Sequence, residues 1–265
     1  MVQALLRPVE PASLPRRPLG EILAGLGCSP DWLWSWDNYK GFVTQLSQEW
    51  RLTRHLDIGG GRDPLFMPEE ARRLGLSVTL NDISAAELAR APASYAKIRC
   101  DIAAKDTMRV IAPESFDFVY SRMVMEHVRD ARQLWANQYA MLAPGGVALA
   151  FVPTLYAPAF ALNHAIPESV SGAILRRLFP DRHEDSDNPK FPAFYDLCYG
   201  DERKVAPVLR EIGFDEVRVL PFYGYSYFWK IPGLKQIDAA FTRLSRARDW
   251  RALTSFAYII GVKGR

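Results

Sequence analysis

The sequence predicts an α/β protein built on a doubly wound, mostly parallel sheet of seven strands, with helices on both faces. Three observations predict this fold class. Short apolar runs alternate with stretches of helical periodicity from residue 54 onward. Glycine- and proline-rich turns separate these runs. The 265 residues, 49% hydrophobic and 24% charged, suffice for one large soluble domain, which we place over residues 1–265.

The expected elements follow one another in a regular order. Strands are predicted at 54–58, 77–82, 94–102, 115–122 and 147–153, and helices between them at 68–76, 84–92 and 130–146. Ser84, followed three residues later by Glu87, is a predicted helix N-cap. A helix at 201–214 and strands at 215–222 and 253–263 complete the pattern. Right-handed crossovers then place the helices on both faces of the sheet.

Three segments depart from this alternation. Residues 21–54 are typical of helices, and we predict that they form an N-terminal lid; Trp32, Trp34 and Trp36 alternate as in a strand and leave that stretch ambiguous. Residues 153–200 and 221–250 are rich in prolines and aromatic residues. Because α/β enzymes place substrate loops after the carboxyl ends of strands, we expect these two insertions to form a substrate cap.

Composition narrows the function classes. The net charge of +3 is too weak to indicate a nucleic-acid partner. The three cysteines are scattered and have no zinc-binding spacing, which favours a reducing compartment. The N-terminus lacks the apolar core of a signal peptide, and no run is long enough to span a bilayer. We therefore expect a cytoplasmic protein, with the inner face of the membrane as the alternative.

The segment HLDIGGGRDP, residues 55–64, indicates a ligand-binding turn between a strand and a helix. Gly59 and Gly61 fit the start of the dinucleotide pattern, but Pro64 stands at its third glycine position. Asp57 would repel a pyrophosphate, so a nicotinamide-dependent reductase is disfavoured. The same carboxylate suits a cationic ligand such as S-adenosylmethionine, which carries an ammonium and a sulfonium.

Acids end three successive predicted strands, at Asp57, Asp82 and Asp101. In a parallel sheet they share one rim, where Asp82 can accept hydrogen bonds from ribose hydroxyls and Asp101 from the adenine amine. The alternative is that each acid only caps the helix after it. Three acids in series favour the ligand.

A resemblance to a known protein family covers residues 38–155. The segments LDIGGGRD, LNDIS, RCDI, FDFVYSRMVMEHVRD and MLAPGGVALAFVPT resemble, in order, the motifs of the class I S-adenosylmethionine-dependent methyltransferases. Asp63 departs from the family pattern, in which a third glycine is common at this position, and this puts the tightness of the loop in doubt. The resemblance implies S-adenosylmethionine as cofactor and a Rossmann-like fold.

The resemblance also implies a set of cofactor-binding residues. The glycines line the methionyl part, the residues after the second and third strands hold ribose and adenine, and those after the fourth close the pocket below the sulfonium. Tyr39 belongs to the expected lid, with plain packing as its alternative. The set is Tyr39, Asp57, Gly59, Gly60, Gly61, Asn81, Asp82, Ile83, Cys100, Asp101, Ile102, Ser121, Arg122 and Met123.

Methyl transfer to a hydroxyl needs a general base, and histidine is the usual candidate. His127 is our first candidate for a base or substrate contact, and His164 in the insertion is the second. The alternative for His127 is that Glu126 and His127 orient the helix after the fourth strand. They could also bind a metal, but no complete ligand set is present, so we predict none. His55 is interpreted as structural and His183 as solvated.

The acceptor is inferred from the insertions, whose aromatic, arginine and aspartate side chains suit sugar rings and hydroxyls. They are similar to a bacterial subgroup found with surface-polysaccharide enzymes, so we expect O-methylation of a sugar or glycan intermediate. A small secondary metabolite, methylated on oxygen or nitrogen, and a non-catalytic cofactor-binding protein are the alternatives. The basic, aromatic residues 223–251 suggest peripheral contact with an anionic membrane and a lipid-linked acceptor, against a simply solvated helix. RNA is disfavoured, because no added binding domain is apparent.

Overall fold

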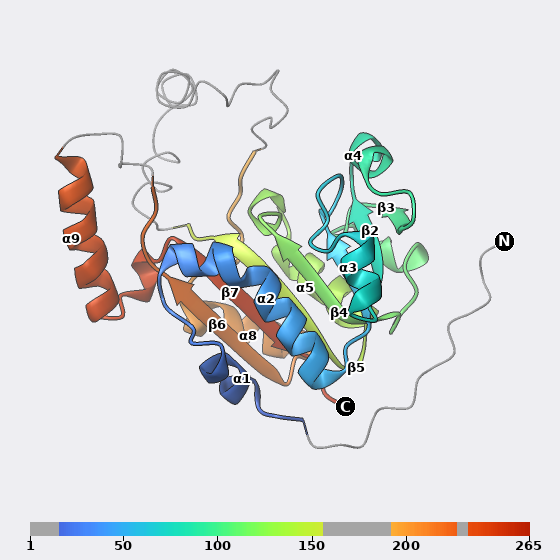
Figure 1. Ribbon diagram of the computed structural model, residues 1–265, viewed down its shortest axis with the longest axis horizontal. Coiled ribbons are helices and arrows are strands. Elements are labelled where there is room, and N and C mark those ends of the chain that lie inside the picture. Colours follow the sequence, from blue (N-terminus) through green and yellow to red (C-terminus); the bar gives the residue numbers. More distant parts are fainter. Residues whose placement is uncertain (1–15, 156–191, 227–232) are drawn as a thin grey trace.

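A computed structural model describes residues 16–155, 192–226 and 233–265 (Figure 1). The predictions that fall on residues 156–191, His164 and His183 among them, lie outside the described residues. Within those residues, no helix combines the length and the apolar character needed to cross a membrane.

One seven-stranded sheet organises the molecule, as predicted. Its order is β3-β2-β1-β4-β5-β7-β6. The first five strands are parallel, and β7 runs antiparallel to both β5 and β6. The strands are β1 (Arg54–Ile58), β2 (Ser77–Asp82), β3 (Ala96–Arg99), β4 (Phe116–Arg122), β5 (Leu142–Pro153), β6 (Glu216–Phe222) and β7 (Phe256–Val262).

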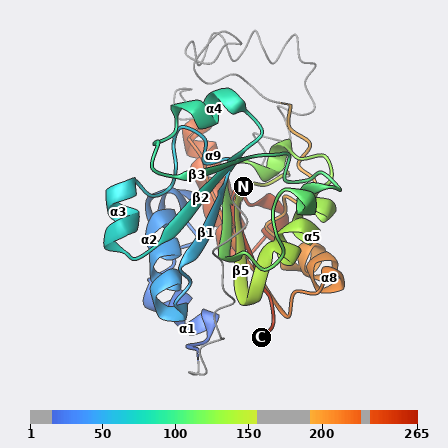
Figure 2. The same cartoon turned by 90° about the vertical axis from the view of Figure 1, so that its right-hand side faces the viewer.

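Helices cover both faces of this sheet. The turned view shows α2 and α3 on one side and α5 and α8 on the other (Figure 2). Ser84 caps α4 as expected, accepting a hydrogen bond from the Glu87 amide. The helices are α1 (Leu19–Gly25), α2 (Trp32–Trp50), α3 (Pro68–Arg73), α4 (Ala85–Arg90), α5 (Ala131–Met141), α8 (Glu202–Ile212) and α9 (Leu234–Ala247), with short 3-10 turns η1 (Thr107–Arg109), η2 (Met125–His127) and η3 (Arg251–Leu253).

The predicted helix over 130–146 ends early, at Met141. Leu142 is extended and already pairs with Phe116 of β4. Pro144 disfavours the helical conformation at the residue before it, and Gly145 has a positive φ of 76°. The proline and the two glycines after it therefore belong to the start of β5.

The tryptophan-rich stretch is helical, and most of it is a core helix rather than the expected lid. In α2 the side chains of Phe42, Val43 and Leu46 are fully buried, and Trp34 stacks on Phe222 of β6 at 5.9 Å between ring centroids. Asp31 caps the helix start by accepting a hydrogen bond from the Leu33 amide. Burial of this apolar face docks α2 on the sheet.

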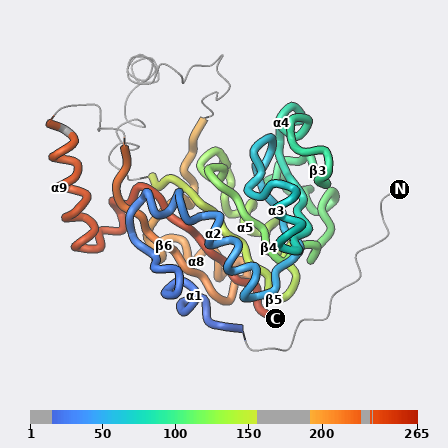
Figure 3. The backbone as a smooth tube through the Cα atoms, in the orientation of Figure 1, coloured from blue at the N-terminus to red at the C-terminus, as the bar shows by residue number. Residues whose placement is uncertain are grey.

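The carboxyl ends of β1, β4, β5 and β6 and the amino end of β7 share one rim of the sheet. The register sets this arrangement, because Phe256 at the start of β7 pairs with both Pro153 and Phe222, the last residues of β5 and β6. The two predicted cap segments leave the sheet at this rim, after β5 and after β6. In the tube view, α9, the helix between β6 and β7, stands at one end of the molecule (Figure 3).

Candidate cofactor site

The glycine turn after β1 is shaped for close approach of a ligand. Gly59 and Gly61 have φ values of 71° and 35°. A Cβ on Gly59 would lie 2.4 Å from Cγ2 of Val124, and one on Gly60 would lie 2.8 Å from Cγ of Asp57. Glycine is therefore required here both by the backbone conformation and by the space. Asp63 does not loosen the turn, because its amide donates to the Gly60 carbonyl at 2.9 Å.

Asp57 is a buried carboxyl beside these glycines, with only 5% of the residue exposed. One oxygen accepts a hydrogen bond from the Leu65 amide at 2.8 Å. Burial raises the pKa of Asp57 to about 7, although that hydrogen bond and the charge of Arg122 act in the opposite direction. A cationic ligand at the turn would favour the ionised form, which is the fit expected for an ammonium group.

Asp82 ends β2 on the other side of the turn. Its Oδ1 accepts from the Ser84 amide at 2.8 Å, and its Oδ2 faces the turn, 2.8 Å from where a Cβ on Gly61 would be. Burial raises the pKa of Asp82. Ile83 beside it is 66% exposed. The pair presents an acceptor and an apolar surface, as ribose and adenine would require.

The residues after β3 fit the predicted adenine contacts only in part. Asp101 is exposed and caps its own turn through the Ala103 amide, and Cys100 is partly exposed beside it. The side chain of Ile102 is 4% exposed and belongs to the core, which leaves little of it to face adenine. Asn81 is also structural: its side-chain amide donates to the carbonyls of Ile98 and Cys100.

The end of β4 lies beside the glycine turn, because β4 pairs with β1. Arg122 forms an ion pair with Asp63 across the turn at 3.3 Å, and the Ser121 hydroxyl is buried without a partner among the described residues. Met123 has a positive φ of 56°, rare for a residue with a side chain. Tyr39 is a packing residue rather than a ligand contact, because it is 2% exposed and its hydroxyl donates to the Ser121 carbonyl.

Glu126 and His127 lie just beyond β4, in η2. Glu126 is buried, one of its carboxylate oxygens has no partner among the described residues, and burial raises the pKa of this carboxyl to about 8. Nε2 of His127 lies 3.8 Å from the other oxygen. Nδ1 of His127 lies 2.8 Å from the Pro192 carbonyl, an acceptor, so Nδ1 carries the proton of the neutral ring. Nε2 then has the lone pair.

Residues 192–198 hold this histidine in place, a contact that no local sequence pattern indicates. The amides of Phe194 and Tyr195 both donate to the Glu126 carbonyl, and Asp196 accepts from the Ala131 amide at the start of α5. The end of the first predicted cap segment is thereby attached to η2. The partners are more than 60 residues apart in the chain.

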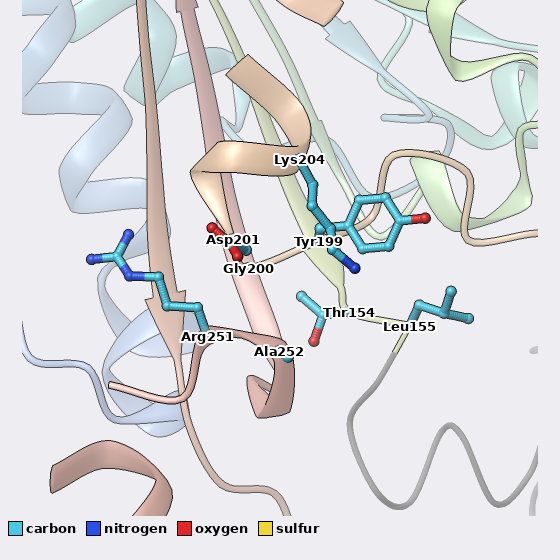
Figure 4. A pocket seen from close by; sticks show the side chains of 8 residues that line it. All are labelled: Thr154, Leu155, Tyr199, Gly200, Asp201, Lys204, Arg251 and Ala252. Carbon is cyan, nitrogen blue, oxygen red and sulfur yellow. The ribbon is translucent and has the colours of Figure 1, made fainter. Parts of the chain in front are cut away.

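A small pocket lies where this segment meets the end of β5 (Figure 4). Thr154 and Leu155 face Tyr199 and Lys204 across it, and Arg251 approaches from η3. The Lys204 ammonium lies 4.8 Å from the centre of the Tyr199 ring. The pocket brings both predicted cap segments to one place on the rim, since Tyr199 belongs to the first and Arg251 directly follows the second.

His55 is structural, as interpreted. It is fully buried between Phe66, Phe118 and Tyr120, its Nε2 lies 3.0 Å from the Leu52 carbonyl, and burial lowers its pKa to about 4. Among the described residues, no three histidine, cysteine or acidic side chains gather as a metal would require.

Known proteins resemble this chain over the same region. Residues 56–150 match the family described as Methyltransferase domain. The ubiquinone biosynthesis O-methyltransferase of Brucella melitensis is 38% identical over 105 residues, which are 38% of this chain and 41% of that protein. The chain thus spans about two fifths of the length of the curated relatives it matches. Over residues 56–150 the chain is thus similar to methyltransferase domains.

Solved structures are similar at lower identity. Phosphoethanolamine N-methyltransferase 2 of Haemonchus contortus, in complex with S-adenosylmethionine, is 18% identical, with a TM-score of 0.48 over 80% of this chain and 49% of that one. A SAM-dependent methyltransferase of Archaeoglobus fulgidus is 15% identical, with the same TM-score over 88% of this chain and all of that one.

The residues present fit the family's cofactor. The glycine turn has the positive φ values that only glycine adopts readily, and the buried Asp57 beside it matches the ammonium of S-adenosylmethionine. Oδ2 of Asp82, directed toward the same turn, matches a ribose hydroxyl. A pyrophosphate would instead meet the Asp57 carboxyl, which disfavours the dinucleotide interpretation.

Proposed function

We propose that this protein transfers a methyl group from S-adenosylmethionine to a hydroxyl of a sugar or glycan intermediate. The observation that carries the proposal is the location of two different groups at one rim. The buried Asp57 with its glycine turn follows β1, and His127 follows the adjacent strand β4. A cationic donor and a hydroxyl acceptor would meet between them.

The bound cofactor supplies an activated methyl group on a sulfonium. The protein's task is then to hold donor and acceptor in line and to exclude water. Asp57 would bind the ammonium, Asp82 the ribose, and Ile83 the adenine face. The ion pair of Arg122 and Asp63 would close the loop over this part of the site.

His127 would remove the proton of the acceptor hydroxyl. The Pro192 carbonyl fixes the proton on Nδ1, so Nε2 is the basic nitrogen. Nε2 would accept the proton of the acceptor hydroxyl, and the bound cofactor would supply the methyl group that replaces that proton on the oxygen. Glu126, whose Oε1 lies 3.8 Å from Nε2, would stabilise the imidazolium when it is in its ionised form. General-base catalysis of this kind is worth about 10²- to 10⁴-fold in rate.

Exposed aromatic rings at the same rim support a sugar acceptor. Trp36, 40% exposed, packs by its edge near Phe151 and Phe256 at the ends of β5 and β7. Phe194 is 38% exposed, with the Arg129 guanidinium 4.7 Å from its ring centre. Flat aromatic surfaces with nearby charged donors suit sugar faces and hydroxyls. A small secondary metabolite is the second candidate, because the curated relative is named for methylation on oxygen in ubiquinone biosynthesis.

The cofactor is tested by thermal unfolding with S-adenosylhomocysteine, S-adenosylmethionine, NAD and NADP added separately. A ligand at 100 times its dissociation constant stabilises the folded state by about 2.7 kcal/mol. We expect a shift with the adenosyl-sulfur ligands alone, abolished by Asp82→Ala and kept by Glu69→Ala on the exposed surface of α3. A shift with NAD alone would overturn the proposal, and retained affinity in the Asp82 variant would overturn the ribose assignment.

The acceptor is tested by transfer of a labelled methyl group to a panel of free and lipid-linked sugars and to phenols. Methylation of a sugar hydroxyl, reduced about 100-fold or more in His127→Gln with unchanged cofactor affinity, is the expected result. Methylation of phenols alone would favour the secondary metabolite. Cofactor binding without transfer to any acceptor would favour the non-catalytic alternative.

A further inference from the structure

The helix α9 contacts the body of the protein through its polar side. Asp238, Thr242 and Ser245 are spaced i, i+4 and i+7 and so lie on one face. Ser245 is 1% exposed, and the Asp238 carboxylate is hydrogen-bonded to the Tyr225 hydroxyl. Thr242 lies against Gly224, 3.3 Å from where a Cβ there would be.

The apolar side of α9 lies about a quarter turn around the helix from these contacts. Ile237, Phe241 and Leu244, again spaced i, i+4 and i+7, are 67%, 36% and 43% exposed. We call these three residues the α9 stripe. A surface helix of a globular protein normally buries its apolar stripe and exposes its polar face. In the part of the chain that the structure describes, this helix instead leaves its apolar stripe exposed, and the α9 stripe is therefore available to a partner.

The positive charge carried by the rest of α9 indicates what kind of partner the α9 stripe binds. Arg243, Arg246 and Arg248 lie on or just after the last turns of α9, and none forms an ion pair with a described residue in the structure. The helix contains one acid, Asp238, and it is engaged by Tyr225. Trp250, which follows, is 39% exposed. Apolar and aromatic side chains with arginines suit the interface of an anionic bilayer, in which arginine stems can lie along the apolar region.

We propose that α9 binds the surface of an anionic lipid bilayer through the α9 stripe. The helix joins β6 to β7 at the rim that carries the cofactor turn, so binding would bring that rim toward the membrane. The proposal is independent of catalysis, because it concerns only the attachment of the protein to lipid.

Sedimentation of the full chain with vesicles tests it. One set contains phosphatidylglycerol and phosphatidylcholine, and the other phosphatidylcholine alone. We expect binding to the anionic set only, weakening as salt is added. The double variant Ile237→Ser, Leu244→Ser should bind at least about tenfold more weakly, because it removes the apolar anchor. Val110→Ser, at an apolar side chain 58% exposed elsewhere, is the matched control and should bind as the parent does.

A variant in which two arginines are neutralised provides an independent test of the proposal. Arg243→Gln, Arg246→Gln should lose most of the preference for anionic vesicles while keeping the thermal unfolding midpoint of the parent. Failure of the parent to sediment with anionic vesicles would overturn the proposal, as would equal binding by the stripe variant. A dimer by light scattering that becomes a monomer in the stripe variant, without vesicle binding, would assign the stripe to a second copy of the chain instead.

Discussion

At the scale of single residues, the burial of the Asp57 carboxyl favours the protein with a cation bound over the ligand-free protein. Its carboxyl is buried beside Gly60 and receives one hydrogen bond, from the Leu65 amide. Ionisation in that place is unfavourable until a cation arrives. The same residue therefore links cofactor binding to pH.

We predict that the affinity for S-adenosylhomocysteine falls as the pH drops below about 7. The pKa of Asp57 is about 7 in the ligand-free protein, so a proton competes with the ammonium of the ligand below that pH. The limiting slope is about tenfold per pH unit. Calorimetric titration between pH 5.5 and 8.5 measures it. In Asp57→Asn the affinity should be lower and nearly independent of pH; an unchanged slope in that variant would contradict the assignment.

Gly59 provides a second test at the residue scale, with Gly75 as its control. Both have a φ near 70°, so alanine costs each of them about 1–2 kcal/mol in backbone strain. Only at Gly59 does the new Cβ meet another atom, the stiff Val124 side chain. We expect Gly59→Ala to lose more stability in urea unfolding than Gly75→Ala and to bind S-adenosylhomocysteine at least about tenfold more weakly. Equal losses in the two variants would contradict this account.

At the scale of elements, the strands and the glycine turn were predictable because their signals are local. The run RHLDI followed by three glycines and the Ser84 cap are read within a few neighbouring residues. Burial and long-range partners are not local. Tyr39 and Ile102 were assigned to the cofactor because their positions match motifs, yet the fold buries both. The contact of His127 with the Pro192 carbonyl depends on a segment 65 residues away.

The role of α2 as a core helix predicts a particular mutational response. Phe42→Ala should cost about 3–5 kcal/mol of unfolding free energy, because a fully buried ring is replaced by a cavity. Leu33→Ala on the same helix, 44% exposed, should cost less than about 0.5 kcal/mol. Urea unfolding measures both. If the two variants proved equally stable, α2 would be a loosely attached lid, as first expected.

At the scale of the whole molecule, the free energy of unfolding depends on pH through buried titratable groups whose pKa values are shifted in opposite directions. His55 has a lowered pKa, so its contribution to folding stability is complete above about pH 6.5 and is lost as the pH falls toward 4. Asp57 and Glu126 have raised pKa values, so their contributions are complete at acid pH and are lost as the pH rises toward 7 and 8. The two trends oppose each other between pH 4 and 6.5.

A comparison of the parent with His55→Gln isolates the histidine. The amide nitrogen of glutamine can still donate to the Leu52 carbonyl, but the side chain does not titrate. The shift from 6.5 to about 4 corresponds to about 3 kcal/mol. We expect the difference in unfolding free energy between parent and variant to shrink by roughly that amount from pH 7 to pH 4, in chemical denaturation. A constant difference would mean that His55 has the same pKa in the folded and in the unfolded protein.

The position of β7 has a consequence for how the protein is made. This strand comes last of the seven in chain order, yet it lies between β5 and β6, and the Tyr258 hydroxyl on it donates to the Ser35 carbonyl of α2. Until β7 has been translated, β5 has an unpaired apolar edge, and α2 lacks its contact with Tyr258. The nascent chain must therefore stay incompletely folded until residue 262 has been synthesised, and during that interval it depends on protection from aggregation.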